Sequence, residues 1–236
     1  MGRRRFNQTA LWLGLFVVVA QRTAGSQQQA TSTGVTADAA QWESEIAQFE
    51  AADRISPPAK GGVLFVGSSS IRMWPDLKAS FPGVNVLQRG FGGSQLSDVN
   101  FFAPRIVLPY EPRLIVLYAG DNDVAEGHSP EEVFSRYRTF VSLVRRSLPQ
   151  TRIAFVSIKP SGSRWHLADK MRKANELVRE YTATDPKLLY VDVFTPMLGP
   201  SGVPRPDLFQ ADSLHMNSNG YAIWRARLDP IVRGNR

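Results

Sequence analysis

Short apolar runs that alternate with helical segments constrain the fold of this chain more than any other feature. Five such runs follow residue 61, and each is apolar at most of its positions rather than at every second one. They cover residues 63–66, 84–87, 114–118, 153–158 and 188–193. Strands with this pattern are covered on both faces, as in a parallel sheet. We therefore predict a five-stranded parallel sheet.

Amphipathic segments lie between the runs and supply the connections that parallel strands need. Ser129-Pro130-Glu131-Glu132 has the form of a capping box with proline at the first helical position, so a helix is expected to start there. Further helices are predicted over residues 164–182 and after Asn219-Gly220. This alternation predicts right-handed crossovers and a three-layer α/β domain over residues 61–233.

The first 20 residues have the pattern of an export signal. Three arginines at positions 3–5 precede an apolar run of eleven residues, 10–20. A helix of that length spans about 16 Å, roughly half of a bilayer core, so residues 1–20 are predicted to be a signal peptide rather than a stable membrane anchor. The sequence does not decide whether cleavage follows Ala20 or occurs a few residues later. It also does not decide between the Sec and the twin-arginine export routes. We expect an exported protein, periplasmic or secreted.

Two further segments separate this signal from the α/β domain. Residues 21–37 are small, polar and low in complexity, which is typical of a flexible linker. Within residues 38–58, Trp42, Ile46 and Phe49 recur at helical spacing ahead of a Pro-Pro pair. The sequence therefore predicts one N-terminal helix over 38–58.

The composition excludes several classes of function. The formal net charge is +7, but the basic residues are scattered rather than clustered, so no nucleic-acid partner is expected. The absence of cysteine excludes disulfides, thiolate metal sites and a thiol nucleophile. Three histidines without an H-E-x-x-H pattern predict no metal site, and the lack of a G-x-G-x-x-G turn or a P-loop lysine predicts no nucleotide or flavin cofactor.

Chemically useful residues follow three of the predicted strands and precede the last predicted helix. These segments are Gly67-Ser68-Ser69-Ser70, Gly90-Phe91-Gly92-Gly93-Ser94, Gly120-Asp121-Asn122-Asp123 and Asp212-Ser213-Leu214-His215. Ligands of such sheets bind outside the carboxyl ends of the strands. We therefore expect the four segments to meet at one edge of the sheet.

Together the four segments contain what the cleavage of an acyl bond requires. A serine hydroxyl such as Ser69 attacks a carbonyl only when a base such as His215 takes its proton. Asp212 lies three residues before His215, and on a single helical turn its carboxylate would fix the imidazole tautomer. The backbone N–H groups of Ser69 and Gly93 and the side-chain amide of Asn122 are candidate donors to the oxyanion.

The four segments resemble, in the same order, the four blocks of the SGNH (GDSL) hydrolase superfamily, which includes the GDSL-like lipases and acylhydrolases. GSSS matches the Gly-Asp-Ser-Leu block, GFGGS the glycine block, GDND the Gly-x-Asn-Asp block and DSLH the Asp-x-x-His block. The resemblance implies a flavodoxin-like α/β/α sandwich and the cleavage of carboxylic esters. The residues that fall on the family's nucleophile, oxyanion hole, acid and base are Ser69, Gly93, Asn122, Asp212 and His215.

The chain departs from this family at one position, where Ser68 stands in place of the usual Asp. An Asp there would cap the following helix or brace the loop. Serine is also a good N-cap, so we expect Ser68 to keep the loop in place with different electrostatics.

Competing assignments have weaker support. His128 and His166 lack an acidic residue three positions upstream. The α/β-hydrolase motif G-x-S-x-G fails because Ile71 occupies the position of its last glycine. Three residues after the fourth run either line the site or belong to the start of the next helix: Lys159, Arg164 and Trp165.

The leading prediction is a serine esterase or acylhydrolase that forms an acyl-enzyme. The chain has no long apolar insertion that could act as a lipase lid, so short acyl groups such as acetyl, on small molecules or glycans, are favoured. An O-acyltransferase with the same triad and a lysophospholipase-like lipid hydrolase are the alternatives. The sequence does not indicate an oligomeric state.

Overall fold

The protein is described by a computed structural model that covers Gly2 and residues 40–234. Within these residues the chain forms a five-stranded sheet in the order β2-β1-β3-β4-β5, and every pair of neighbours is parallel. The strands are β1 (Val63–Gly67), β2 (Val86–Gly90), β3 (Leu114–Tyr118), β4 (Arg152–Val156) and β5 (Leu188–Val191). The predicted parallel sheet is thereby confirmed. The signal predicted over 1–20 and the linker predicted over 21–37 lie outside the described residues.

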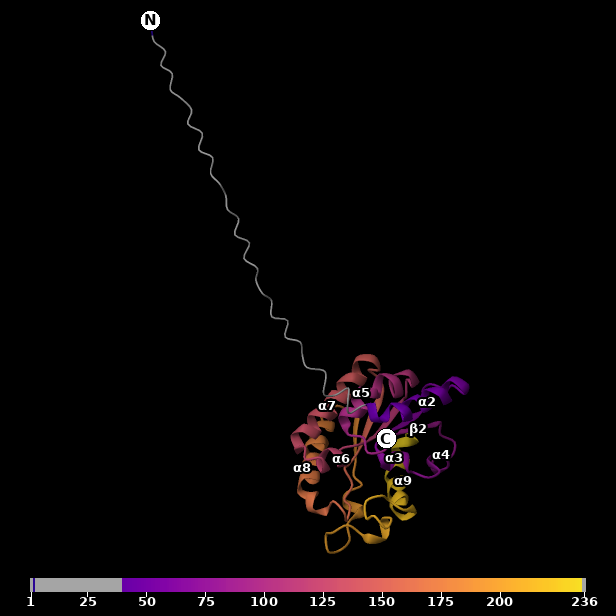
Figure 1. Ribbon diagram of the computed structural model, residues 1–236, viewed down its shortest axis with the longest axis vertical. Coiled ribbons are helices and arrows are strands. Elements are labelled where there is room, and N and C mark those ends of the chain that lie inside the picture. Colours follow the sequence, from indigo (N-terminus) through magenta and orange to yellow (C-terminus); the bar gives the residue numbers. More distant parts are fainter. Residues whose placement is uncertain (1, 3–39, 235–236) are drawn as a thin grey trace.

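Helices cover both faces of the sheet and complete the predicted α/β/α sandwich (Figure 1). On one face lie α2 (Glu43–Ile55), α5 (Leu96–Ile106), α7 (Pro130–Ser147) and α8 (Ala168–Thr182), whose apolar residues share a core with Leu64 and Val66. On the other face lie α3 (Ser69–Arg72), α4 (Leu77–Ser80) and α9 (Ser218–Val232), whose core includes Val63 and Phe65. Successive residues of β1 thus face opposite layers, as the pleat of a strand requires.

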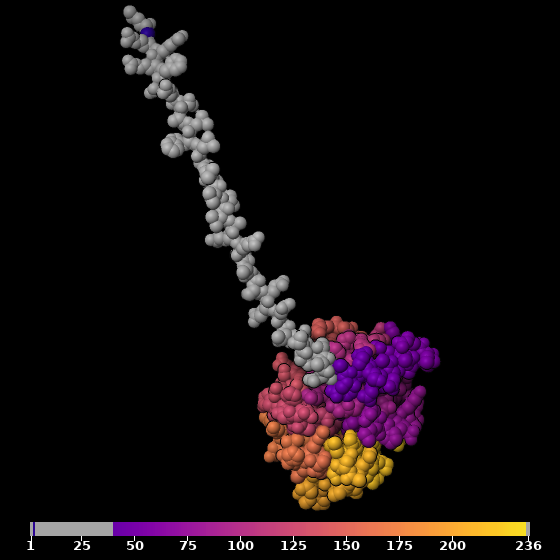
Figure 2. All heavy atoms as spheres, viewed as in Figure 1, coloured from indigo at the N-terminus to yellow at the C-terminus, as the bar shows by residue number. Residues whose placement is uncertain are grey.

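Short elements connect these layers. They are α6 (Asp121–Ala125) and the 3₁₀ helices η1 (Ala40–Trp42), η2 (Leu108–Tyr110), η3 (Trp165–Leu167), η4 (Thr195–Met197) and η5 (Pro206–Leu208). In the space-filling view, the residues of α2, coloured indigo, pack directly against later parts of the chain (Figure 2). No helix among the described residues is long and apolar enough to cross a bilayer.

The local signals in the sequence place one helix start correctly and two only approximately. The capping box at Ser129 forms as predicted, since its hydroxyl accepts a hydrogen bond from the Glu132 N–H at 3.2 Å. The last helix begins earlier than predicted, at Ser218, because the Asn217 side chain accepts hydrogen bonds from two N–H groups of the first turn. The segment predicted as a helix from residue 164 starts as η3 and becomes α-helical at Ala168.

The sheet differs from the sequence prediction in β2, which was expected over residues 84–87 and covers Val86–Gly90 instead. The added residues include Arg89, which is polar yet only 7% exposed. Its guanidinium forms an ion pair with Asp53 of α2 and donates a hydrogen bond to the Tyr110 hydroxyl at 2.8 Å. A buried charge is tolerated when it is paired in this way, and neither partner is a neighbour in the sequence.

Candidate active site

Ser69 lies at a sharp turn where β1 passes into the short helix α3. Gly67 makes this turn with φ of +136°, and a Cβ built there would lie 1.8 Å from the carbonyl oxygen of Tyr118 in β3. Only glycine is compatible with that approach. Ser69 is therefore the first residue of a helix that begins two residues after the end of a central strand, and its side chain is half-buried.

The side chains of Ser69, His215 and Asp212 form one line of hydrogen bonds. His215 Nε2 lies 3.2 Å from Ser69 Oγ, although the two residues are 146 positions apart. His215 Nδ1 lies 2.6 Å from Asp212 Oδ2 on the other side of the ring. A carboxylate only accepts, so Nδ1 carries the proton and Nε2 is left as the acceptor for the serine hydroxyl. This arrangement lowers the pKa of Asp212 to about 2, first through the hydrogen bond from His215 and then through that from the Leu214 N–H.

The segment from Asp212 to His215 is a turn and not the helical turn that the sequence predicted. Asp212 Oδ1 accepts hydrogen bonds from the N–H groups of Leu214 and His215, both at 2.9 Å, and Ser213 adopts a left-handed conformation with φ of 54°. An aspartate that bonds to the backbone two residues on stabilises such a turn. The same carboxyl group therefore shapes the backbone with one oxygen and orients the imidazole with the other.

The loop after β4 supports this turn from outside. Ser163 donates its N–H to the carbonyl of Ser213 at 3.2 Å. A Cβ built on Gly162 would lie 3.2 Å from the Cβ of Ser213, so the two segments pack closely. The position of His215 thus depends on the loop between β4 and η3 as well as on its own turn.

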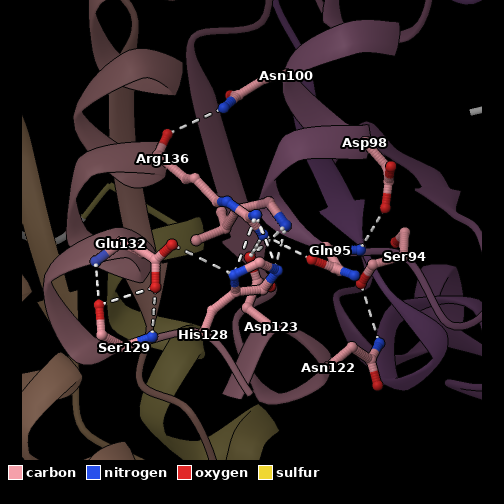
Figure 3. A network of polar contacts seen from close by, with 11 residues as sticks. Ser94, Gln95, Asp98, Asn100, Asn122, Asp123, His128, Ser129, Glu132 and Arg136 are labelled. Atoms are coloured by element: carbon pink, nitrogen blue, oxygen red, sulfur yellow. Dashed lines mark hydrogen bonds and ion pairs between the residues drawn. The ribbon is translucent and has the colours of Figure 1, made fainter. Parts of the chain in front are cut away.

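Asn122 and Gly93 lie where their N–H groups are available for a ligand. Asn122 Nδ2 donates one hydrogen bond to the carbonyl of Ser94 at 2.9 Å, visible in Figure 3, and an amide nitrogen carries a second hydrogen. Gly93 is exposed, with φ of +77°. Among the described residues, no backbone carbonyl accepts a hydrogen bond from the N–H of Ser69 or from that of Gly93. Phe91 N–H, at the start of the same loop, bonds to the carbonyl of Gly67 at 2.9 Å, so the glycine loop lies beside the Ser69 turn.

A buried cluster of charges lies directly behind Asn122. Asp121 Oδ2 is 3.3 Å from Lys159 Nζ and 3.2 Å from an Arg164 nitrogen, and Arg164 Nη2 also donates to Asn122 Oδ1 at 3.0 Å. Burial alone would raise the pKa of Asp121, but Lys159 and Arg164 together hold it below its usual range. Burial also lowers the pKa of Lys159. The sequence left Lys159, Arg164 and Trp165 as residues that line the site or start a helix. Lys159 and Arg164 lie behind Asn122, and the missing signal was their common partner in the GDND segment. Trp165 is the first residue of η3 and packs on Phe194.

The other two histidines do not contact Ser69. His128 Nε2 lies 2.9 Å from Arg136, which forms an ion pair with Asp123 at 2.7 Å, and this network is drawn in Figure 3. Asp123 in turn accepts a hydrogen bond from the Leu96 N–H, so the network anchors the start of α5. His166 is an exposed residue of η3.

Ser68 differs from the expectation that its hydroxyl caps the next helix. It occupies the N-cap position of α3, but its side chain makes no capping hydrogen bond. The hydroxyl is fully buried and has no partner in the described part of the chain. The turn is held instead by the backbone, since Ser68 N–H bonds to the carbonyl of Tyr118 at 3.0 Å.

A parallel α/β/α sandwich that carries a serine, a histidine and an amide donor at its strand ends has the architecture of the SGNH hydrolases. The GDSL-like lipase/acylhydrolase family matches residues 60–223, and the chain belongs to this family. It is therefore an ester-cleaving hydrolase.

Individual proteins are similar to this chain over most of their length. Platelet-activating factor acetylhydrolase IB subunit alpha1 of Bos taurus is 28% identical over 181 residues, which are 72% of this chain and 75% of that protein. The solved structure of a Streptococcus pneumonia protein has a TM-score of 0.73 at 18% identity and covers 84% of this chain and 96% of its own. A GDSL-like lipase of Bacteroides thetaiotaomicron has a TM-score of 0.68 at 20% identity, with 81% and 98% covered.

Proposed function

We propose that the protein is a serine esterase in which Ser69 is the nucleophile, His215 the general base and Asp212 the residue that orients the base. The observation that carries this proposal is the line of hydrogen bonds from Ser69 Oγ through the imidazole to the Asp212 carboxylate, at 3.2 and 2.6 Å. Such a line provides a hydroxyl nucleophile with the base that it lacks at neutral pH.

The reaction has two halves that use the same groups. Ser69 Oγ forms a bond to the ester carbonyl carbon while its proton passes to His215 Nε2, and the resulting tetrahedral species expels the alcohol, which takes the proton from Nε2. Water then attacks the acyl-Ser69 ester, gives its proton to Nε2 and releases the carboxylic acid, and the proton returns to Ser69. Net, one ester and one water become one alcohol and one acid.

In both tetrahedral species the former carbonyl oxygen carries negative charge. We assign its donors to the backbone N–H groups of Ser69 and Gly93 and to the second hydrogen of Asn122 Nδ2. Within the part of the chain that the structure describes, neither backbone N–H has a backbone acceptor, and the amide keeps one hydrogen beyond its bond to Ser94. Each such donor is worth about 2.7–4 kcal/mol of the barrier.

We propose short acyl groups, acetyl above all, as the favoured substrates. The side chains in line with Ser69, His215 and Asp212, are polar, and the Asp212 side chain is 46% exposed, so these contacts offer a long chain little apolar surface to bury at about 0.8 kcal/mol per CH₂. The curated relative is named an acetylhydrolase. An acetyl-xylooligosaccharide esterase from a Geobacillus species shares the fold, with a TM-score of 0.59 at 15% identity. Acetylated glycans and small acetyl esters are therefore the first substrates to assay.

The test compares Ser69→Ala with Ser68→Ala on p-nitrophenyl esters of two to sixteen carbons and on acetylated xylo-oligosaccharides. Ser68 is the matched control because its buried hydroxyl has no hydrogen-bond partner among residues 40–234 that a substitution could remove. We expect Ser69→Ala to lose all but background turnover, Ser68→Ala to keep it, and the rate to be highest for the shortest chains. Full activity of Ser69→Ala would contradict the proposed nucleophile, and a maximum at long chains would contradict the acyl preference. An added alcohol that captures most of the acyl group would mark a transferase instead.

A further inference from the structure

Trp42 contacts the glycine loop from the N-terminal part of the chain. It is the last residue of η1, precedes the segment that the family matches, and is only 7% exposed. Its Nε1–H donates a hydrogen bond to the carbonyl oxygen of Gly92 at 2.6 Å, and its ring packs edge-on against Phe91 with centroids 5.9 Å apart. A side chain from outside the four sequence blocks therefore holds a peptide group of the loop.

This contact determines where the Gly93 N–H points. Gly92 C=O and Gly93 N–H belong to one peptide unit, and in a trans peptide the two groups point in opposite directions. Fixing the oxygen on Trp42 directs the N–H away from Trp42. Since glycine is conformationally permissive and Gly93 is exposed with φ of +77°, this peptide would rotate readily without such an anchor.

Arg164 does the corresponding work for Asn122. A guanidinium only donates hydrogen bonds, so the amide atom that it contacts at 3.0 Å must be the oxygen. The carbonyl of Ser94 only accepts, so the atom that it contacts at 2.9 Å must be the nitrogen. The two neighbours together leave a single orientation of the amide, with its free hydrogen on Nδ2.

The buried cluster in turn holds Arg164 in place. Arg164 and Lys159 both pair with Asp121, and the exposed fractions of these side chains are 19%, 1% and 5%.

We propose that Trp42 and Arg164 are positioning residues of the oxyanion hole, Trp42 acting through the Gly93 N–H and Arg164 through the Asn122 amide. This inference rests on the proposed function, because it assigns work to donors that matter only if an oxyanion forms at Ser69. Both residues act on the transition state rather than on the bound ester, so their loss lowers kcat and leaves KM nearly unchanged.

The experiment measures kcat and KM of Trp42→Phe, Arg164→Gln and Arg164→Lys on p-nitrophenyl acetate. The concentration of active sites in each preparation is determined by titration with a fluorophosphonate, and kcat is expressed per active site. Trp42→Phe keeps an aromatic ring against Phe91 and removes the Nε1–H donor together with part of the indole volume. We expect kcat to fall about tenfold or more for Trp42→Phe and for Arg164→Gln, with KM within about twofold. Arg164→Lys keeps the charge and one donor, and should recover part of the loss.

Controls come from the same region. Trp165→Phe alters a tryptophan that packs on Phe194, and Arg172→Gln alters an arginine that lies over Trp165 and Phe194. Neither of these residues contacts a proposed donor, so both variants should keep the wild-type kcat. Thermal unfolding of every variant shows whether a loss of rate follows a loss of stability, and a kcat that falls only in step with melting temperature would overturn the proposal.

A double-mutant cycle with Asn122→Ala separates the two routes. If Arg164 acts through the amide, Arg164→Gln should have nearly no further effect once Asn122 is alanine, whereas Trp42→Phe should still lower kcat about tenfold. Equal additional losses for both variants, or none for either single variant, would contradict the assignment. Ser69→Ala is run in parallel: if it abolishes turnover while Trp42→Phe and Arg164→Gln are fully active, this inference fails and the proposed function stands. Full activity of Ser69→Ala removes the proposed function itself.

Discussion

Asp212→Asn separates the two roles that the structure gives to one carboxyl group. The asparagine oxygen can still accept the hydrogen bonds from the N–H groups of Leu214 and His215, both at 2.9 Å in the native turn, so the backbone should stay in place. The amide nitrogen would then face His215 Nδ1, where it can only donate. The imidazole would be driven to the tautomer with its proton on Nε2, which cannot take a proton from Ser69.

The structure sets the expected magnitudes. A fully buried aspartate in this role is worth about 10⁴-fold in kcat, but the side chain of Asp212 is 46% exposed and water can compete for its contacts, so we expect a loss of about 10²- to 10⁴-fold. The fall of the Asp212 pKa from 3.8 to about 2 corresponds to at most roughly 2.5 kcal/mol, and with solvent screening we expect about 1 kcal/mol of folding stability. Activity should therefore collapse while the protein stays folded.

The assay is kcat on p-nitrophenyl acetate beside urea unfolding of the same preparation. Because the folded-state pKa of Asp212 is lowered, its contribution to stability is complete above the unfolded value near 3.8 and is lost as the pH falls toward about 2. Wild type and Asp212→Asn should thus differ in unfolding free energy at pH 6 and converge near pH 2. A kcat within tenfold of wild type would refute the assignment of the base's tautomer to Asp212.

Three further predictions follow from close contacts. In Gly162→Val, the added side chain would push into the catalytic turn, because even a Cβ at this position would lie 3.2 Å from the Cβ of Ser213. We expect kcat to fall about tenfold while the unfolding free energy changes by under about 2 kcal/mol; a kcat equal to that of the wild type would argue against the support of the turn by this loop. Gly67→Ala places a Cβ 1.8 Å from the carbonyl oxygen of Tyr118 in β3, so the free energy of unfolding, measured with urea, should fall by at least about 3 kcal/mol. A glycine that was needed only for flexibility would not show such a loss. Asp53→Ala leaves the buried Arg89 without its carboxylate partner and should lower the free energy of unfolding by about 3 kcal/mol while kcat per active site is unchanged. An unaltered urea midpoint would contradict the burial of that pair.

The sheet could be predicted because its central strands are apolar on both faces, as in β1 and β3. The limits of β2 could not, since the buried Arg89 pairs with Asp53 and Tyr110, which are 36 and 21 residues away in the sequence. Sequence patterns record local preference, whereas a buried charge depends on distant partners.

The site shows the same division. The rule that strand ends meet at one edge brought Ser69 and His215 together across 146 residues, and the structure places them 3.2 Å apart. The backbone between Asp212 and His215 was mistaken for a helical turn, because a spacing of three also fits a turn closed by an aspartate side chain. The contacts of Trp42 with Gly92 and of Arg164 with Asn122 left no local pattern, since each joins segments more than 40 residues apart.

The central claim is that Ser69 forms a covalent bond to the acyl group with His215 as its base. Peptide mass mapping after brief reaction with p-nitrophenyl acetate, quenched in acid, tests it most directly. We predict an acetyl group on the peptide that contains Ser69, present in the wild type and in Ser68→Ala and missing from Ser69→Ala and His215→Ala. Acetylation that persists in Ser69→Ala at the same rate, or that maps to a different residue of the wild type, would contradict the account.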